Sequence, residues 1–284
     1  MLRVAIQGEK GCFHDAAAHA YFEKYRDIMT VPCDTFPDMF DTMATNKDMV
    51  AVMAIENTIA GPLLQNHELL RNSKLYVTGE IKQRISHVLC ALPGQSINDI
   101  TEVNSHPMAL MQCEKFLRHY PHLKAVEKDD TAGSAAEIVR KNLFGHAAIC
   151  GEYAAHLYGL DVLASNIETN PHNYTRFLVL AHMSDKDNNR INAIHNNINK
   201  AMVQFTLPHT TGALSKVLTI FSFYDINLTK IQSTPIIGCE WEYRFYVDLT
   251  FNSEERYRQA LEAVRPLSNQ LSVLGEFTDA PTVG

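Results

Sequence analysis

The stretch Val50-Ala51-Val52-Met53-Ala54-Ile55-Glu56-Asn57-Thr58 holds six apolar residues followed by three polar ones. A short apolar run of this kind is typical of a strand buried on both faces, as in a parallel sheet. Ligands of such sheets bind beyond the carboxyl ends of the strands, which is where Glu56 to Thr58 fall. The stretch therefore predicts an α/β domain with a polar site after the strand at 50–55.

The same alternation of short strands and helices continues on both sides of this stretch. We expect strands at 3–7, 29–33, 101–104, 123–126, 146–150 and 174–181, and helices at 14–25, 37–45, 107–119 and 131–140. Strands that alternate with helices indicate an α/β domain with a mostly parallel sheet.

The composition changes at residues 184–200, where six Asn residues and several charges replace the apolar blocks. Such a stretch cannot build a core, so we predict a linker there. Beyond it, strands at 201–207, 227–237, 241–251 and 271–277 alternate with helices at 212–223 and 254–264. This order is βαββαβ, the ferredoxin-like plan. The predicted domains are 1–183 and 201–284, joined by the linker at 184–200.

Composition and charge narrow the class of protein. The 284 residues carry 25 Lys and Arg against 32 Asp and Glu, a net charge of −7, which disfavours a nucleic-acid partner. No segment approaches the roughly 20 apolar residues that span a bilayer, and the N-terminal apolar run is too short for a signal peptide. We therefore expect a cytoplasmic protein without a membrane partner. The chain contains neither C-x-x-C nor H-E-x-x-H, so we expect no metal site.

Five polar clusters fall at the ends of predicted elements. They are Gly8-Glu9-Lys10-Gly11-Cys12-Phe13-His14, Glu56-Asn57-Thr58, Asn104-Ser105-His106-Pro107, Asp129-Asp130-Thr131-Ala132-Gly133-Ser134 and Asn173-Tyr174-Thr175-Arg176-Phe177. Each has an ordinary structural explanation: a βα turn, a helix cap such as Ser105 before Pro107 or Thr131 at the helix that runs to Arg140, or close helix packing. Glycine turns and helix N-termini can instead hold an anion. The glycine turn does not match the dinucleotide or phosphate-loop patterns.

Taken together, the clusters resemble the prephenate dehydratase family. Its motifs Glu-Asn-Ser, Ser-His-Pro-x-Ala-Leu-x-Gln-Cys, Thr-Ala-x-x-Ala-Ala and Asn-x-Thr-Arg-Phe are matched in order at 56–58, 105–113, 131–136 and 173–177. Thr58 stands where the family usually has Ser, and Cys12 where Thr or Ser is common. The second half resembles an ACT regulatory domain whose first helix opens at Gly212-Ala213-Leu214. No chorismate mutase helices precede the match, so we expect a single activity.

This resemblance implies a two-lobed catalytic domain like a periplasmic binding protein, and a decarboxylating dehydration of prephenate to phenylpyruvate without a cofactor. Thr175 would be the catalytic donor to the leaving hydroxyl, and Arg176 would grip a substrate carboxylate. Helix N-termini near Phe13 and at Thr131 would hold carboxylate oxygens. The substrate-binding residues implied by the motifs are Asn57, Thr58, Ser105, His106, Thr131, Arg176 and Phe177.

The resemblance also implies control by L-phenylalanine at an ACT dimer interface. The effector residues would be Gly212, Ala213, Leu214, Asn227, Gln232, Ser233, Thr234 and Pro235, with the family's Glu-Ser-Arg-Pro replaced by Gln232-Ser233-Thr234-Pro235. We expect a homodimer or homotetramer. Two alternatives stay open: an arogenate dehydratase, which performs the same elimination on the transaminated substrate, and a cytosolic amino-acid sensor without catalysis.

Overall fold

The computed structural model describes residues 1–23, 27–183, 198–280 and 282–283. Most of the predicted linker lies outside the described residues. The chain forms two compact units, one of Met1–Pro62, Ile81–Phe177 and Thr282–Gly284, the other of Leu63–Glu80 and Leu178–Pro281. Two strands, β5 (Leu75–Arg84) and β11 (Tyr174–His182), contribute residues to both units.

The first unit begins with parallel strands around the apolar stretch at 50–55. Its elements are β1 (Leu2–Gln7), α1 (Phe13–Phe22), β2 (Ile28–Cys33), α2 (Phe36–Thr45), β3 (Met49–Asn57) and β4 (Gly61–Pro62). Strand β1 pairs in parallel with β2 and with β3. The first seven residues of β3 are buried, as its apolar run predicted. A capping box between Thr35 and Asp38 starts α2, with Pro37 in its first turn.

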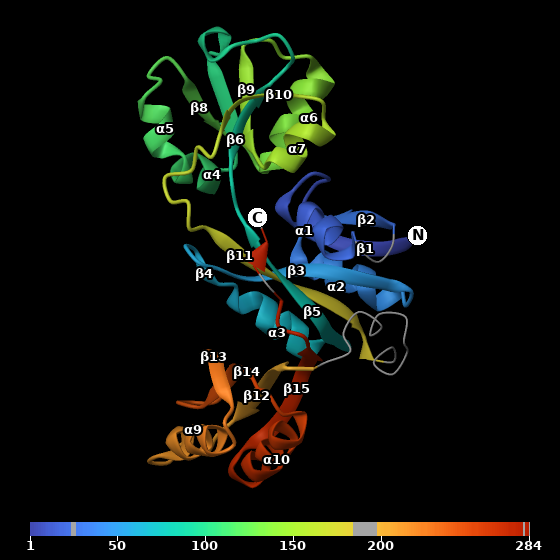
Figure 1. The fold of residues 1–284 in the computed structure, drawn as a ribbon, viewed down its shortest axis with the longest axis vertical. Coiled ribbons are helices and arrows are strands. Elements are labelled where there is room, and N and C mark those ends of the chain that lie inside the picture. Colours follow the sequence, from blue (N-terminus) through green and yellow to red (C-terminus); the bar gives the residue numbers. More distant parts are fainter. Residues whose placement is uncertain (24–26, 184–197, 281, 284) are drawn as a thin grey trace. The chain divides into compact units, whose positions relative to one another are not determined.

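A separate five-stranded sheet completes the first unit (Figure 1). Its order is β10-β6-β9-β7-β8, with β7 parallel to β8 and β9, and β6 antiparallel to β9 and β10. The elements are β6 (Val88–Ala91), a 3₁₀ turn (Ile97–Asp99), β7 (Glu102–Ser105), α4 (Pro107–Gln112), α5 (Glu114–Arg118), β8 (Lys124–Glu127), α6 (Thr131–Lys141), β9 (His146–Cys150), α7 (Glu152–Leu157) and β10 (Asp161–Ser165). The fold is mixed α/β with two sheets.

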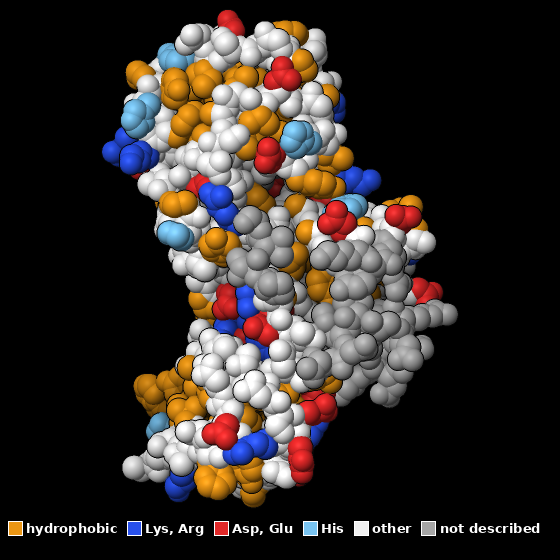
Figure 2. Space-filling model, viewed as in Figure 1, with side chains coloured by type: hydrophobic (Ala, Val, Ile, Leu, Met, Phe, Trp, Pro, Cys, Tyr) orange, Lys and Arg blue, Asp and Glu red, His pale blue; other side chains and the backbone are white. Residues whose placement is uncertain are grey.

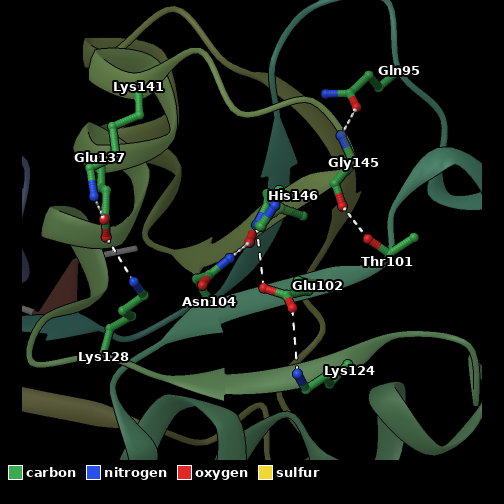
Figure 3. Close-up of polar contacts among 11 residues, drawn as sticks. Gln95, Thr101, Glu102, Asn104, Lys124, Lys128, Glu137, Lys141, Gly145 and His146 are labelled. Atoms are coloured by element: carbon green, nitrogen blue, oxygen red, sulfur yellow. Dashed lines mark hydrogen bonds and ion pairs between the residues drawn. The ribbon is translucent and has the colours of Figure 1, made fainter.

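Polar contacts fasten the strands and helices of this second sheet (Figure 3). Thr101 Oγ1 donates to Gly145 O at 3.1 Å, and Glu102 lies 3.5 Å from His146. Next to them, hydrogen bonds from Lys141 and Lys128 lower the pKa of Glu137 to about 2. Thr101 and Glu102 thus join the start of β7 to the start of β9, and Lys128 joins the end of β8 to α6.

The second unit contains the βαββαβ order that the sequence predicts. Its elements are α3 (Leu64–Asn72), β12 (Lys200–Thr206), α9 (Ala213–Phe223), β13 (Asn227–Pro235), β14 (Tyr243–Thr250), α10 (Glu254–Val264), a 3₁₀ turn (Arg265–Leu267) and β15 (Asn269–Phe277). The strand order β13-β14-β12-β15 is antiparallel at each of these pairings. Strands and helices enclose a core that includes Phe205, Phe221 and Tyr257.

Residues 63–80 pack with this unit through buried polar contacts. Tyr246 Oη donates to Glu68 at 2.6 Å, and Tyr76 Oη donates to Glu276 at 3.0 Å. Lys200 Nζ donates to Glu80 at 2.8 Å and to Asp279 at 2.8 Å. Lys200, which the sequence placed in the linker, is therefore a buried residue of β12. Its ammonium is neutralised by carboxylates far away in the sequence.

The strand β16 (Thr282–Val283) pairs in parallel with β5 at Lys82 and Gln83, so the described end of the chain belongs to the first unit.

Candidate active site

Asn57, the last residue of β3, organises the candidate site. Its side-chain amide donates to Asn173 Oδ1 at 2.7 Å, to Tyr174 O at 3.1 Å and to Thr175 Oγ1 at 2.9 Å. Its own Oδ1 accepts from the backbone N–H groups of Ile59 and Ala60. Asn57 thus joins the end of β3 to the start of β11 and shapes the turn that follows it.

The bond to Thr175 fixes the direction in which this hydroxyl can act. Because Asn57 donates to Oγ1, the oxygen serves as an acceptor on that side and its proton remains available for another group. The Thr175 side chain is 9% exposed, so water competes little for the donor. This arrangement suits a hydroxyl that donates a hydrogen bond to a ligand.

Arg176 lies beside Thr175 and is bound to a carboxylate of the same unit. Its Nη1 donates to Glu56 Oε1 at 3.0 Å, and the guanidinium side chain is 6% exposed. The sequence predicted Arg176 as the grip for a substrate carboxylate. The structure shows that one face of the guanidinium already holds Glu56, which the sequence analysis left without a role.

A cavity of about 560 Å³ opens over these residues, lined by Glu56, Asn57, Thr58, Lys82, Tyr174, Thr175 and Arg176. This volume falls within the range of small-molecule sites, which are roughly 300 to 1,000 Å³. The cavity brings together two of the predicted motifs, Glu56-Asn57-Thr58 and Tyr174-Thr175-Arg176. It adds Lys82 of β5, for which no sequence motif gave a signal.

Thr58 fastens the two motifs to each other. Its hydroxyl donates to His172 O at 3.0 Å and accepts from Tyr174 N at 2.9 Å, while its backbone N–H donates to Tyr174 O at 2.9 Å. The hydroxyl that the resemblance assigned to substrate is therefore engaged with the backbone. This explains how Thr can stand where the family usually has Ser, since a positioning hydroxyl tolerates the added methyl group.

A polar chain continues from Asn57 toward the second sheet. Asn173 Nδ2 donates to Gln112 Oε1 at 3.2 Å, and the same oxygen lies 2.9 Å from His87 Nε2. Burial lowers the pKa of His87, so the neutral ring donates through Nε2 to the amide oxygen. Gln112 and Asn173 stand in predicted motifs, but neither was singled out, and nothing in the sequence marked His87.

Glu168 holds together the chain segments that connect the two sheets of the first unit. Its carboxylate accepts from Arg84 Nη2 at 2.8 Å and from His87 N at 3.0 Å. Ile85 N donates to Asn173 O at 2.7 Å, which joins the end of β5 to the start of β11. These bonds fix the backbone from which Lys82 and Thr175 project.

Phe177 is a core residue in this structure. It is 1% exposed, and its ring packs edge-on against His14 at 5.0 Å between centroids. His14 Nε2 in turn accepts from Ala54 N at 3.2 Å, and burial lowers the pKa of His14 to about 4. Phe177 therefore supports β3 and β11 from behind and does not line the cavity.

Ser105 and His106 lie outside the cavity. Ser105 is fully buried, and its hydroxyl donates to Ile149 O at 2.6 Å. His106, rather than Ser105, caps α4: its Nδ1 accepts from Met108 N at 3.2 Å. The expectation of a Ser105 cap was wrong by one residue, because both side chains can accept from the first helical turn.

The cap at α6 is displaced in the same way. Asp130 accepts from Gly133 N at 2.6 Å, so Thr131, which the sequence predicted as the cap, is the first helical residue. The Asp130 carboxylate also lies near Gly8 of the first glycine turn. An acidic side chain thus already occupies this helix N-terminus, and Thr131 does not line the cavity at Thr175. Its contact with substrate remains a prediction.

The second unit has a cavity of about 490 Å³ of its own, lined by Leu207, Pro208, His209, Thr210, Thr211, Ala213, Leu214, Trp241, Tyr243 and Phe245. It contains two of the predicted effector residues, Ala213 and Leu214. Gly212, at φ 75°, is the residue before α9. Asn227 lies at the start of β13, and Gln232 to Pro235 at its end, outside this cavity. Figure 2 shows hydrophobic side chains on the surface of the part that contains β13 and β14. Ile237 and Trp241, in the turn between these two strands, are exposed.

Neither a metal-binding cluster nor a membrane-spanning helix is found among the described ranges. No group of three or more His, Cys, Asp or Glu side chains there is arranged to hold a metal ion. No helix in the same ranges has both the length and the hydropathy needed to cross a membrane.

A mixed α/β fold, a small-molecule cavity and a hydroxyl donor beside an Arg–Glu pair define a protein that acts on a small polar ligand. The family described as prephenate dehydratase matches residues 4–185. The chain belongs to this family, as its motifs predicted.

Individual relatives agree with this assignment. The protein named arogenate dehydratase/prephenate dehydratase 2, chloroplastic, from Arabidopsis thaliana is 35% identical over 97% of this chain and 72% of its own length. The crystal structure of prephenate dehydratase in complex with L-Phe from Arthrobacter aurescens has a TM-score of 0.80 at 25% identity, over 99% of this chain and 93% of that one. A structure described as a novel type of quorum quenching acylase, GqqA, has a TM-score of 0.85 at 26% identity, over 98% of both chains.

Proposed function

We propose that this protein is a prephenate dehydratase, which converts prephenate into phenylpyruvate, CO2 and water. The observation that carries the proposal is the hydrogen bond from Asn57 to Thr175 Oγ1. Because this bond uses Oγ1 as an acceptor, the hydroxyl proton is available to a ligand in the cavity, which the cationic side chains of Lys82 and Arg176 also line. Family membership supports the same reaction.

The reaction needs a donor at one end of the substrate ring. The bond from the ring to the carboxylate breaks, its electrons enter the ring, and the opposite C–O bond breaks to release hydroxide, which takes a proton to become water. Thr175 donates a hydrogen bond to the departing oxygen while the charge develops there. A positioned donor of this kind is typically worth about 10² to 10³ in rate. The proton that completes water comes from solvent, because a threonine hydroxyl is too weak an acid to supply it.

The test is turnover of prephenate by the purified protein, followed through the absorbance of phenylpyruvate in alkali. Thr175→Ala should lower kcat by about 10² or more with a small change in KM, and Thr175→Ser should retain more activity than Ala. Near wild-type kcat in Thr175→Ala would remove this role from the hydroxyl. Absence of product from the wild-type protein would refute the proposed activity itself.

Two other activities belong in the same assay. Arogenate is the relevant second substrate, because the plant relative is named for both dehydratase activities. An acylated amine is the third substrate to test, because one of the structures that this chain resembles is described as an acylase. The cavity-lining residues include a carboxylate, Glu56, but it is paired with Arg176, and they include no His or Cys. This composition does not favour attack on an amide.

We propose further that the βαββαβ part of the second unit is an ACT domain that binds L-phenylalanine. The cavity beside α9 presents Ala213, Leu214 and three aromatic residues, Trp241, Tyr243 and Phe245, to an apolar side chain. The helix α9 begins after Gly212, which has no side chain to cap the helix. The N-terminal N–H groups of α9 therefore suit the amino-acid carboxylate. Gln232 to Pro235 and Asn227 would complete the site from a second copy of the chain. The relative solved with L-Phe supports this assignment.

The predicted domain division into 1–183, 184–200 and 201–284 is part of this proposal. It separates the chain by function, with catalysis in the first part and regulation in the last. A two-lobed, binding-protein-like catalytic domain and a homodimer or homotetramer belong to the same proposal. Sedimentation of the purified protein with and without L-phenylalanine tests the oligomeric state.

A further inference from the structure

His87 is a buried polar residue without a role in the proposed reaction. It lies between β5 and β6, and its ring packs edge-on against Phe13 at 5.6 Å between centroids. Its Nε2 lies 2.9 Å from Gln112 Oε1, whereas Nδ1 is buried and has no hydrogen-bond partner among the described residues. Removing an imidazole from water costs free energy that one hydrogen bond only partly returns. A histidine buried in this way indicates a role beyond packing.

The chain of side-chain amides that begins at Asn57 has a direction that backbone groups set. Ile59 N and Ala60 N can only donate, and they donate to Asn57 Oδ1 at 2.9 and 2.8 Å. The amide nitrogen of Asn57 therefore faces the other way, toward Thr175 Oγ1 at 2.9 Å and Asn173 Oδ1 at 2.7 Å. Because a backbone N–H cannot exchange donor and acceptor, the orientation of the Asn57 amide is unambiguous.

The same direction passes from one amide to the next until it reaches the imidazole. Because Asn173 presents its oxygen to Asn57, its nitrogen faces Gln112 and donates to Oε1 at 3.2 Å. Gln112 therefore presents an oxygen to His87, and only a protonated Nε2 can complete that contact. A proton on Nδ1 would be buried without an acceptor. Both observations require the neutral form of His87 with its proton on Nε2.

Gln112 is the residue through which His87 reaches the catalytic end of the chain. Its Oε1 accepts from two donors, His87 Nε2 and Asn173 Nδ2. Without the donor on His87, the Gln112 amide loses one of the two bonds that fix its rotamer. Asn173 then loses a fixed acceptor, and the Asn57 amide loses a fixed partner beside Thr175.

We propose that His87 is a positioning residue of the reaction: its Nε2–H group fixes a chain of three side-chain amides that ends at the Thr175 hydroxyl. The three amides are those of Gln112, Asn173 and Asn57. This inference rests on the proposed dehydratase function. His87 does not line the cavity at Thr175, so it acts on the reaction through these bonds alone.

Steady-state kinetics with prephenate test this role. His87→Phe keeps a ring and removes the donor, so kcat should fall about threefold to tenfold, the worth of one neutral hydrogen bond, while KM changes less than about twofold. His87→Gln places an amide N–H near the position of Nε2 and should recover most of the loss. The control His156→Phe makes the same substitution at an exposed side chain of this unit and should match wild type. Unchanged kcat in His87→Phe would overturn the proposal.

A second background separates positioning from general destabilisation. Because His87 acts through the Thr175 hydroxyl, it has nothing to position in Thr175→Ala. His87→Phe should therefore lower kcat in the wild-type background and change it less than about twofold in the Thr175→Ala background. An equal fractional loss in both backgrounds would mean that His87 only stabilises the fold, which would also overturn the proposal.

The protonation of the ring can be measured without turnover. Nitrogen-15 NMR distinguishes a protonated from a bare imidazole nitrogen, and we expect His87 in wild type to carry its proton on Nε2. Asn57→Asp presents an acceptor to Asn173 Oδ1, so Asn173, and after it Gln112, should turn their amides over. Gln112 then presents a donor to Nε2, and the His87 proton should move to Nδ1 in a measurable fraction of the molecules.

The NMR result also separates this inference from the proposed function. An unchanged His87 signal in Asn57→Asp, or a proton on Nδ1 in wild type, would mean that the amides are not coupled and would overturn the proposal. A wild-type protein that shows the expected ring signals and their change in Asn57→Asp, but does not convert prephenate, would refute the activity and leave the coupling of His87 to Thr175 in place.

Discussion

The buried ammonium of Lys200 should be among the most sensitive positions of the second unit. Lys200 is 2% exposed and Glu80 is 1% exposed, and they are joined at 2.8 Å. Lys200→Met keeps most of the side-chain length and removes the charge, so the buried Glu80 carboxylate loses its cation. Breaking one partner of a buried ion pair typically costs about 3 to 5 kcal/mol. We expect a loss of that size in the free energy of unfolding.

The double variant distinguishes the pair from ordinary packing. Glu80→Gln combined with Lys200→Met replaces two charges by neutral side chains of similar volume and should recover more than half of the loss. Urea unfolding monitored by the fluorescence of Trp241, the single tryptophan and part of the same unit, supplies the midpoints. A loss below about 1 kcal/mol in Lys200→Met, or a double variant no more stable than the single one, would refute the reasoning.

Three further outcomes follow from the site and the effector region. Asn57→Asp keeps the acceptor for the turn but removes the donor to Thr175, so kcat should fall by about 10²; the melting temperature should fall as well, because the bonds to Asn173 and Tyr174 are lost, and unchanged kcat would contradict the positioning role. The pKa of His14 is about 4 when folded and 6.5 when unfolded, so its contribution is complete above pH 6.5 and is lost as pH falls toward 4. Because His14 is only half-buried, wild type should lose at most about 3 kcal/mol of unfolding free energy relative to His14→Gln over this pH range. Equal slopes of stability against pH in the two proteins would mean that the His14 ring is exposed to water in the folded protein. Titration calorimetry should detect L-phenylalanine binding to wild type and much less to Gly212→Val, since valine is strained at φ 75°; no heat with wild type would refute the regulatory proposal, and equal heat in both would place the effector elsewhere.

Much of the fold could be predicted because the apolar patterns are local. The run at 50–55 predicts a buried strand whatever its neighbours are, and the βαββαβ order follows from the spacing of apolar blocks. The helix predicted at 107–119 is divided in the structure, because α4 ends at Gln112 and α5 begins at Glu114. No element was predicted at 63–91, which contains α3, β5 and β6. The helix α3 buries Asn66 and His67, and a polar buried face leaves no apolar periodicity to detect.

The candidate site was predictable in its motifs and not in its contacts. Asn57, Thr175 and Arg176 lie together because β3 ends where its neighbour β11 begins, so the polar residue at the end of one strand meets those at the start of the other. The caps at His106 and Asp130 were missed because neighbouring side chains have the same capping chemistry. Lys82 gives no signal in the sequence, because its place in the cavity depends on the strand β5, which no local pattern identified.

The segment 63–80 has a consequence for how freely the parts of this protein can be exchanged. The chain leaves the first unit after Pro62, shortly past Glu56-Asn57-Thr58, and re-enters it at Ile81, next to Lys82. Between these points it packs with the C-terminal unit through Glu68, Tyr76 and Glu80. If the part of the chain after residue 183 were transplanted alone, it would therefore arrive without the segment 63–80 that it packs against. A functional chimera requires that segments 63–80 and 178–281 be inherited from the same parent.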